Sequence, residues 1–181
     1  MRFVFLDRDG TLIEEPANCQ VDSLEKVRFK PGVFEGLRQL REAGYELVMV
    51  TNQDGIGSPT FTWEMFDEAQ DYFMNEMESR GIRFFDVFVC PHMPEEHCDC
   101  RKPEIGLVRD FVWENEMEPE DSFMVGDRPT DVEFAKNLEI RSIYLSNPRF
   151  PVSPDSEVQP DHVAVDLMDG VRYILSLKAG S

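Results

Sequence analysis

The first eleven residues constrain the fold of this chain more than any other segment. Arg2–Leu6 is an apolar run rich in β-forming residues, and it ends at the polar sequence Asp7-Arg-Asp9-Gly-Thr11. A short apolar run that stops at such residues predicts a buried strand followed by a turn. Taken alone, this Asp-Arg-Asp-Gly sequence would indicate only a turn. Its meaning therefore depends on the residues that come after the other strands.

Apolar runs and helical patterns alternate along the rest of the chain. Further strands are predicted at Glu46–Val50, Phe84–Val89, Ser122–Val125 and Ser142–Leu145, and helices at Pro31–Gly44, Thr62–Arg80, Pro103–Glu116, Pro129–Asn137 and Asp166–Leu177. This alternation predicts an α/β fold, a Rossmann-like parallel sheet with helices on both faces. We expect one domain over residues 1–181, with Ser146–Asp161 as a surface loop. No insertion large enough for a cap domain is evident.

Charge and composition exclude several classes of partner. The 181 residues carry a net charge of −18, which disfavours nucleic acid and a polybasic membrane contact. No targeting segment and no apolar run of membrane-spanning length is visible, so we expect a cytoplasmic location. The oligomeric state is left open.

Polar sequences follow four of the predicted strands. They are Asp7-Arg-Asp9-Gly-Thr11, Thr51-Asn-Gln-Asp54, Arg101-Lys102-Pro103 and Gly126-Asp127-Arg-Pro-Thr-Asp131. Because the carboxyl ends of parallel strands lie at one edge of the sheet, all four are expected to meet there. Scattered surface charges would not produce this arrangement.

The expected cluster has the residues for phosphoryl transfer. Asp7, Asp9 and Asp127 would form a hard oxygen site for Mg²⁺. One carboxylate could attack phosphorus, and the second could protonate the leaving oxygen. Thr51 and Lys102 would hold the non-bridging oxygens. Asp54 and Asp99 have no such role and are predicted to be solvated loop carboxylates.

These four sequences, in this order, resemble the four motifs of the haloacid dehalogenase-like phosphatases, and the resemblance covers nearly the whole chain. It implies that Asp7 is the nucleophile and a Mg²⁺ ligand. It implies that Asp9 is the general acid/base and offers its carbonyl to the metal. It also implies phosphate binding by Thr51, Asn52 and Lys102, a Mg²⁺ ligand at Asp127, and an outer role at the substrate or metal for Asp131.

A second cluster precedes Lys102. Cys90, His92, Cys98 and Cys100 form a compact C-x-H-x5-C-x-C pattern, which supplies four ligands for a tetrahedral structural zinc. Such a site would order the loop at about 90–100 that leads to Lys102. His97 is expected to face solvent, and Cys19 to be a free thiol.

Two branches of the resembled family carry a zinc loop. The short loop and the sequence Glu-Pro followed by Gln-Val-Asp are similar to the histidinol-phosphate phosphatases, whose substrate is cationic at the end away from phosphate. Glu15 and Gln20 are therefore candidates for binding the amine and imidazole, since residues 12–25 contain no basic residue. Ordinary exposed charges at Glu14 and Glu15 are the competing interpretation. Members of the resembled family are often fused to a dehydratase domain, so the resemblance leaves open a fused or associated dehydratase and a stand-alone enzyme.

Three alternatives remain open from the sequence. The first is the heptose bisphosphate phosphatase branch, which also carries a zinc loop. The second is a non-enzymatic zinc-binding interaction module, although this would not need Asp7, Asp9, Lys102 and Asp127 together. The third is a mutase, which would normally require a sizeable cap domain.

Overall fold

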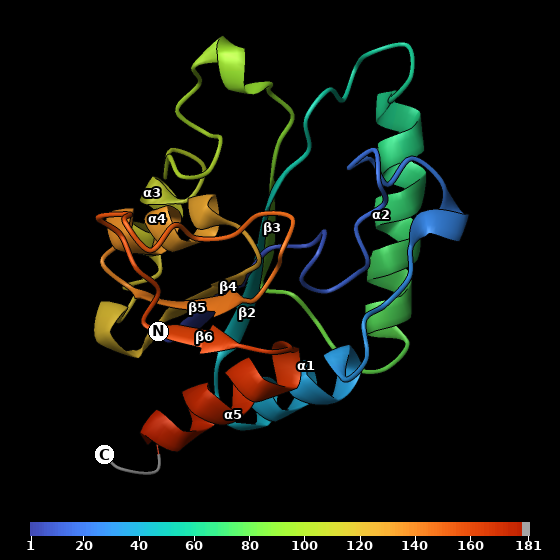
Figure 1. Ribbon diagram of the computed structural model, residues 1–181. Helices are drawn as coiled ribbons and strands as arrows, with labels where there is room; N and C mark the ends of the chain where they lie inside the picture. Colours follow the sequence, from blue (N-terminus) through green and yellow to red (C-terminus); the bar gives the residue numbers. More distant parts are fainter. Residues whose placement is uncertain (179–181) are drawn as a thin grey trace.

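The structure, a computed structural model, describes residues 1–178. Its centre is a sheet of six parallel strands in the order β3-β2-β1-β4-β5-β6 (Figure 1). The strands are β1 (Phe3–Leu6), β2 (Glu46–Asn52), β3 (Asp86–Cys90), β4 (Phe123–Gly126), β5 (Arg141–Leu145) and β6 (His162–Ala164). The direction of winding reverses beside β1. In open parallel sheets, ligands bind at the carboxyl edge beside such a reversal.

Five α-helices cover the two faces of this sheet. They are α1 (Val33–Glu42), α2 (Trp63–Glu78), α3 (Arg109–Glu114), α4 (Pro129–Asn137) and α5 (Leu167–Lys178). Helices α1, α2 and α5 share one hydrophobic cluster, and α3 and α4 share the other. The predicted parallel sheet with helices on both faces is confirmed (Figure 1).

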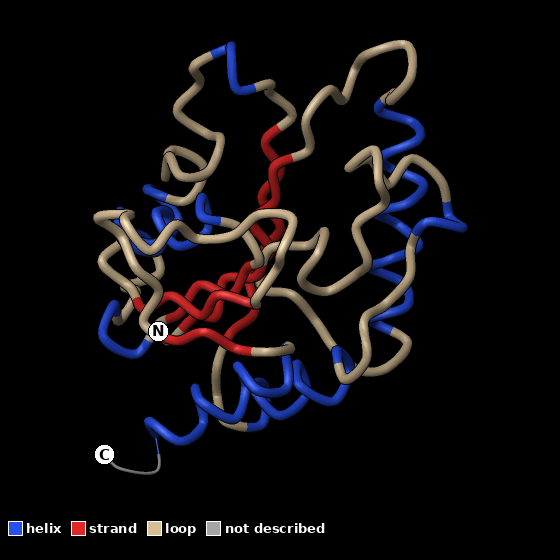
Figure 2. Tube along the Cα trace, viewed as in Figure 1, coloured by secondary structure: helices blue, strands red, loops and turns tan. Residues whose placement is uncertain are grey.

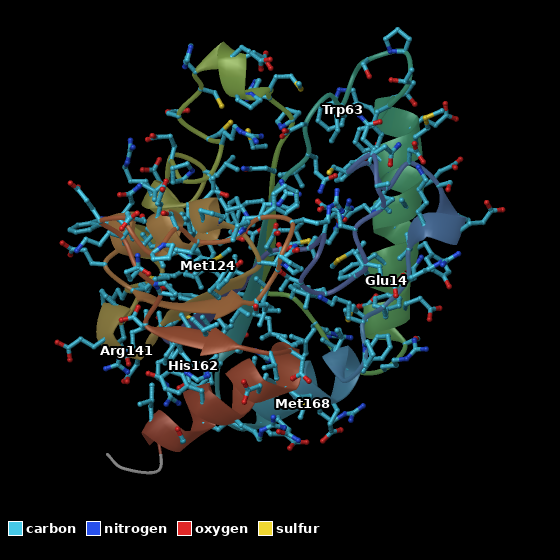
Figure 3. The ribbon with its side chains drawn as sticks, viewed as in Figure 1. Glu14, Trp63, Met124, Arg141, His162 and Met168 are labelled. Atoms are coloured by element: carbon cyan, nitrogen blue, oxygen red, sulfur yellow. The ribbon has the colours of Figure 1, made fainter. Side chains whose placement is uncertain are left out.

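Alternate residues of each strand feed these two clusters. Val4 and Leu6 of β1 point into the first, whereas Phe3 and Phe5 point into the second. The strand is apolar throughout because both of its faces are buried. Met124 of β4 packs with α4, and Met168 of α5 lies beside α1, where a Cβ on Gly36 would come within 3.2 Å of its sulfur (Figure 3).

Two elements differ from the sequence prediction. Helix α3 begins at Arg109 rather than at Pro103, because Gly106 donates a backbone hydrogen bond of 2.8 Å to Asp99 and is held in a turn. Strand β6 was not predicted, and its three residues depend on pairing with β5.

Helix α2 is less buried than its aromatic spacing predicted. Phe66, Phe73 and Met77 are core residues, but Trp63 is 49% exposed and Tyr72 is 38% exposed. The helical spacing of Trp63, Phe66, Tyr72, Phe73 and Met77 in the sequence predicts that all five side chains are core, and this prediction is wrong for Trp63 and Tyr72. No helix within residues 1–178 has the length and apolar character needed to cross a bilayer.

The segments after β2 and β3 extend together beyond the carboxyl edge of the sheet (Figure 2). The second includes a short 3₁₀ turn at Pro94–Glu96 and carries the cysteine and histidine cluster. The long segment between β5 and β6 has no regular secondary structure, as predicted for Ser146–Asp161.

Candidate active site

A polar cavity of about 230 Å³ lies at the carboxyl edge, beside the reversal at β1. Segments that are far apart in the sequence meet in it: the ends of β1, β2 and β4, the start of α4, and the loop before α3. Its lining residues are Asp7, Asp9, Glu15, Cys19, Asn52, Asp54, Arg101, Lys102, Arg128, Pro129, Thr130, Asp131 and Phe150.

Lys102 connects two buried carboxylates in this cavity. Its Nζ donates hydrogen bonds to Asp7 Oδ1 at 2.8 Å and to Asp131 Oδ1 at 2.7 Å. All three side chains are at most 8% exposed. Asp131 also lies in the first turn of α4, where its Oδ2 accepts the backbone N–H of Arg128 at 3.1 Å. The helix start thereby fixes the carboxylate that holds the lysine.

Burial and crowding govern the ionisation of this group. Burial raises the pKa of Asp7 to about 8; Lys102 opposes this effect, while Asp131 and Asp127 add to it. Burial and Asp131 likewise raise the pKa of Asp127. Burial opposes the charge of Lys102, but its two carboxylate neighbours raise its pKa above the ordinary value. The carboxylates of Asp7, Asp127 and Asp131 therefore repel one another around the single ammonium group of Lys102.

The carboxylates have an arrangement that a further cation would fit. Oxygens of Asp7, Asp127 and Asp131 lie within 4.8 Å of one another. Asp127 receives a hydrogen bond from Asn147 on Oδ2 at 2.6 Å, but its buried Oδ1 has no hydrogen-bond partner among residues 1–178. An unpaired buried carboxylate oxygen is costly unless a positive group meets it. Hard oxygen donors suit Mg²⁺.

The side chain of Asp9 lines the same cavity but lies outside that carboxylate group. Its two oxygens accept hydrogen bonds from Arg8 and Gln53. The predicted pair Asp7 and Asp9 is thus brought to one cavity with different surroundings.

Thr51 and Asn52, at the end of β2, are engaged with neighbouring protein groups. The Thr51 hydroxyl accepts a hydrogen bond from Gln53 at 2.8 Å, and Thr51 is not among the cavity-lining residues. Asn52 lines the cavity, and its amide bonds both the N–H and the C=O of Lys102, at 2.9 and 3.1 Å. Asn52 therefore fixes the backbone from which Lys102 projects.

The structure separates the two residues proposed to grip the substrate. Glu15 lines the cavity, where it pairs with Arg128 and lies 3.5 Å from Arg149. Burial raises the pKa of Glu15, although Arg128 opposes the effect. Gln20 is not among the lining residues and lies near Gly55 instead. The cavity mouth therefore carries both an acidic group, Glu15, and two basic groups, Arg128 and Arg149.

The second predicted cluster is assembled in the loop after β3. Ligand atoms of Cys90, His92, Cys98 and Cys100 all lie within 4.8 Å of one another, and the three cysteines are free thiols. The Cys90 and Cys100 sulfurs are 3.0 Å apart, and His92 Nδ1 lies 3.0 Å from the Cys100 sulfur. Three thiols and one imidazole are a donor set that fits tetrahedral zinc.

The ionisation of these thiols is uneven. Burial opposes ionisation of Cys98, but backbone hydrogen bonds from Cys100 and Arg101 help to lower its pKa to about 7. Burial raises the pKa of Cys90. His97 is exposed and outside this group, and Cys19 lies away from it at the cavity mouth.

Several residues that sequence reasoning gave no role also contribute. Arg8, Gln53 and Asn147 contact the carboxylates, and Arg128 and Arg149 reach the mouth from loops. Asp54 was predicted to be a solvated loop carboxylate; its side chain is 38% exposed, but it also pairs with Arg101 and lines the cavity. Asp99 is exposed. Arg8, Gln53 and Arg128 lie within the polar sequences that follow the strands, whereas Asn147 and Arg149 lie outside them and had no sequence signal.

Comparison with known proteins agrees with this geometry. A family model described as HAD-hydrolase-like matches residues 99–170. A solved heptose bisphosphate phosphatase from B. bronchiseptica, complexed with magnesium and phosphate, shares the fold at a TM-score of 0.86 and 24% identity. That match covers 98% of this chain and 99% of the other. A putative HAD-like phosphatase from Mesorhizobium loti matches at a TM-score of 0.77 and 23% identity, over 98% and 87% of the two chains.

Residues 99–170 are therefore similar in sequence to HAD-like hydrolases, and the chain shares the fold of solved HAD-like phosphatases. Its sequence relatives include the histidine biosynthesis bifunctional protein HisB of Buchnera aphidicola, 44% identical over 82% of this chain, and of Xylella fastidiosa, 47% identical over 81%. The chain spans about 40% of the length of these relatives: 42% and 39% respectively.

Proposed function

We propose that this domain hydrolyses histidinol phosphate to histidinol and phosphate through an aspartyl-phosphate on Asp7. The observation that carries the proposal is the buried contact of Lys102 with Asp7 and Asp131, beside the unpaired oxygen of Asp127. A structural ion pair would not need three carboxylates around one lysine in an open cavity. A site that binds a phosphoryl group and a divalent cation would need this arrangement.

The chain's own residues account for each step. A carboxylate oxygen of Asp7 attacks phosphorus while Asp9 protonates the departing oxygen. Asp9 then takes a proton from the water that cleaves the acyl phosphate. Lys102 holds the non-bridging oxygens. Thr51 would assist only if its hydroxyl donated toward the phosphate, because it accepts a hydrogen bond from Gln53 and lies outside the cavity lining. Mg²⁺ bound by Asp7, Asp127 and the Asp9 carbonyl would neutralise phosphate charge and polarise phosphorus.

The substrate assignment is supported by the relatives, which are named for histidine biosynthesis. Within the site, Glu15 Oε2 is buried and accepts no hydrogen bond among the described residues. It is a candidate acceptor for the substrate amine. Gln20 would reach the substrate only if its loop moved, because it lies outside the cavity lining.

The heptose bisphosphate alternative has one observation in its favour. Arg128 and Arg149 bring two positive charges to the mouth from outside residues 12–25, and a second phosphate group would pair with them. Both arginines face Glu15 in this structure, which partly neutralises them.

The zinc site is proposed to be structural, since its four protein ligands leave no open position. Thiolates that stay reduced to bind metal fit a cytoplasmic location. The relatives are called bifunctional, so the proposal includes a fused or associated second domain, expected to be a dehydratase. Residues 1–181 are proposed to form one phosphatase domain.

Phosphate release from a panel of esters, with and without Mg²⁺, tests the proposal. We expect Mg²⁺-dependent turnover of histidinol phosphate, well above that of heptose bisphosphate. Asp7→Asn should lower kcat by more than about 1,000-fold, as expected for loss of a nucleophile. Asp155→Asn, an exposed carboxylate in the segment after β5, is the matched control and should retain activity.

Two outcomes would contradict different parts of the proposal. Preference for the heptose substrate would overturn the substrate and leave the chemistry in place. No turnover of any ester by a folded, Mg²⁺-loaded protein would favour the non-enzymatic zinc module.

A further inference from the structure

Arg8 lies between the two motif carboxylates in sequence and is 0% exposed. Its guanidinium makes four hydrogen bonds. Nε donates to Asp9 Oδ1 at 2.7 Å, and Nη2 donates to Asp9 Oδ2 at 3.2 Å and to Gln53 Oε1 at 3.0 Å. Nη1 donates to Gln70 Oε1 of α2 at 2.8 Å. The Phe66 ring lies 5.3 Å from the guanidinium carbon.

A fully buried guanidinium is not needed to stabilise this part of the core. A buried ion pair is often no more stabilising than apolar residues of similar volume, because both charges must leave water. What the arginine supplies, and an apolar side chain would not, is a planar fork that fixes both oxygens of one carboxylate. The carboxylate it fixes is Asp9.

Gln53 completes the enclosure of Asp9 from β2. Its Nε2 donates to Asp9 Oδ2 at 3.1 Å and to the Thr51 hydroxyl at 2.8 Å, while its Oε1 accepts from Arg8. Both ends of the amide are therefore used, which fixes its orientation. The residue is 2% exposed, so water does not compete for these bonds.

The bonds to Asp9 are distributed unequally. Oδ2 accepts two hydrogen bonds, from Arg8 and Gln53, whereas Oδ1 accepts one, from Arg8. A carboxyl group has about four lone-pair sites. One site therefore stays available on Oδ1, in a side chain that lines the same cavity as Asp7 and Lys102.

We propose that Arg8 and Gln53 are positioning residues that orient Asp9 so that Oδ1 exchanges the proton with the leaving oxygen. The proposal rests on the proposed function, in which Asp9 is the general acid. As the bond from phosphorus to the ester oxygen breaks and the bond to Asp7 forms, the proton on Oδ1 moves to the departing alkoxide. Oδ1 then takes a proton from the attacking water, which restores the acid.

The dependence of rate on the leaving group distinguishes positioning from general support of the fold. An alkyl ester such as histidinol phosphate needs its leaving oxygen protonated, whereas p-nitrophenyl phosphate releases a stable phenolate. Arg8→Met, Arg8→Lys and Gln53→Met should lower kcat for the alkyl ester by about 10- to 100-fold, a partial loss of the roughly 100- to 10,000-fold contribution of general acid catalysis. The single-turnover rate of p-nitrophenolate release, which reports attack by Asp7 before water is activated, should change little. Arg8→Lys should lose less than Arg8→Met, since it keeps the charge without the fork.

Asp9→Asn and Arg2→Met are the reference variants. The first should show the same selective loss on the alkyl ester. The second replaces an arginine outside the site, which contacts Tyr45, and should leave the ratio of the two esters unchanged. If Arg8→Met fails to fold, Gln53→Met and Arg8→Lys still carry the test.

A second readout does not depend on turnover. The Arg8 Nε–H in the protein without added Mg²⁺ should give a slowly exchanging NMR signal that shifts in Asp9→Asn. Equal losses on both esters in the Arg8 and Gln53 variants would overturn the positioning role, as would no loss on either. Wild type inactive on both esters would instead contradict the proposed function itself.

Discussion

A neutral side chain from a loop distant in sequence orients one carboxylate of the candidate site. Asn147, in the segment after β5, donates to Asp127 Oδ2 at 2.6 Å and leaves Oδ1 as the unpaired oxygen. The amide thus orients the carboxylate that is proposed to bind Mg²⁺. Partners behind a metal ligand commonly change affinity by about 10- to 100-fold when removed.

Asn147→Ala is therefore expected to raise the Mg²⁺ concentration needed for half-maximal activity by about 10-fold, with a smaller effect on kcat at saturation. Titration of activity against Mg²⁺ measures this. Asn75→Ala, at an exposed position in α2, is the control. An unchanged Mg²⁺ requirement would mean that Asn147 does not orient a metal ligand.

Gly126 ends β4 beneath Asp131. A Cβ at this position would overlap the Asp131 carboxylate, which holds Lys102. Gly126→Ala should destabilise the fold by about 1–3 kcal/mol through overpacking and lower kcat on the order of 100-fold by displacing the lysine. Gly170→Ala is also crowded, with Ile143 at 2.9 Å, but α5 lies away from the site. It should lose stability and keep kcat, as measured by urea unfolding and phosphate release.

At the scale of elements, β2 and the loop that carries the proposed zinc ligands, residues 90–100, jointly hold Lys102. Asn52 fixes the lysine backbone, and Arg101 connects Asp54 to the His92 carbonyl. These protein contacts tie the loop to the site independently of the proposed zinc. We expect loss of zinc to impair positioning of Lys102 without abolishing catalysis.

Cys98→Ser is predicted to lose bound zinc and to lower Mg²⁺-saturated kcat by about 10-fold or more, because a small misplacement of a catalytic group is costly. Metal content by mass spectrometry and proteolysis near residues 91–101 would accompany the assay. Cys19→Ser, at the exposed cysteine outside the cluster, should retain zinc and the loop's resistance. Full activity of zinc-free Cys98→Ser would mean that zinc binding by the loop is not needed to position Lys102.

Elements were predictable where local pattern and tertiary packing agree. β1, β2 and α4 follow from apolar runs and from a proline at a helix start. α3 starts late because Gly106 approaches the Asp99 backbone, a contact with no sequence signature. The carboxylates of the site could be predicted because they end strands. Asn147 and Arg149 could not, because their positions depend on how the segment after β5 crosses the sheet edge.

Across the whole molecule, negative charge exceeds positive charge by 18, and part of this excess is buried at the site. Two effects of cations on stability should therefore be separable. Ordinary salt screens the repulsion among surface carboxylates. Mg²⁺ should in addition bind the folded state at Asp7 and Asp127, and any ligand specific to the folded state stabilises it by mass action.

At a concentration 100 times its dissociation constant, Mg²⁺ should stabilise the protein by about 2.7 kcal/mol, or about 5–10 °C in Tm. NaCl at equal ionic strength should give only the screening effect. Asp127→Asn should be more stable than wild type without Mg²⁺, since it relieves repulsion with Asp7 and Asp131. It should respond to NaCl as wild type does and lose the additional Mg²⁺ effect. Thermal unfolding of both proteins in matched salts measures these differences, and an undiminished Mg²⁺ effect in Asp127→Asn would place the bound cation elsewhere.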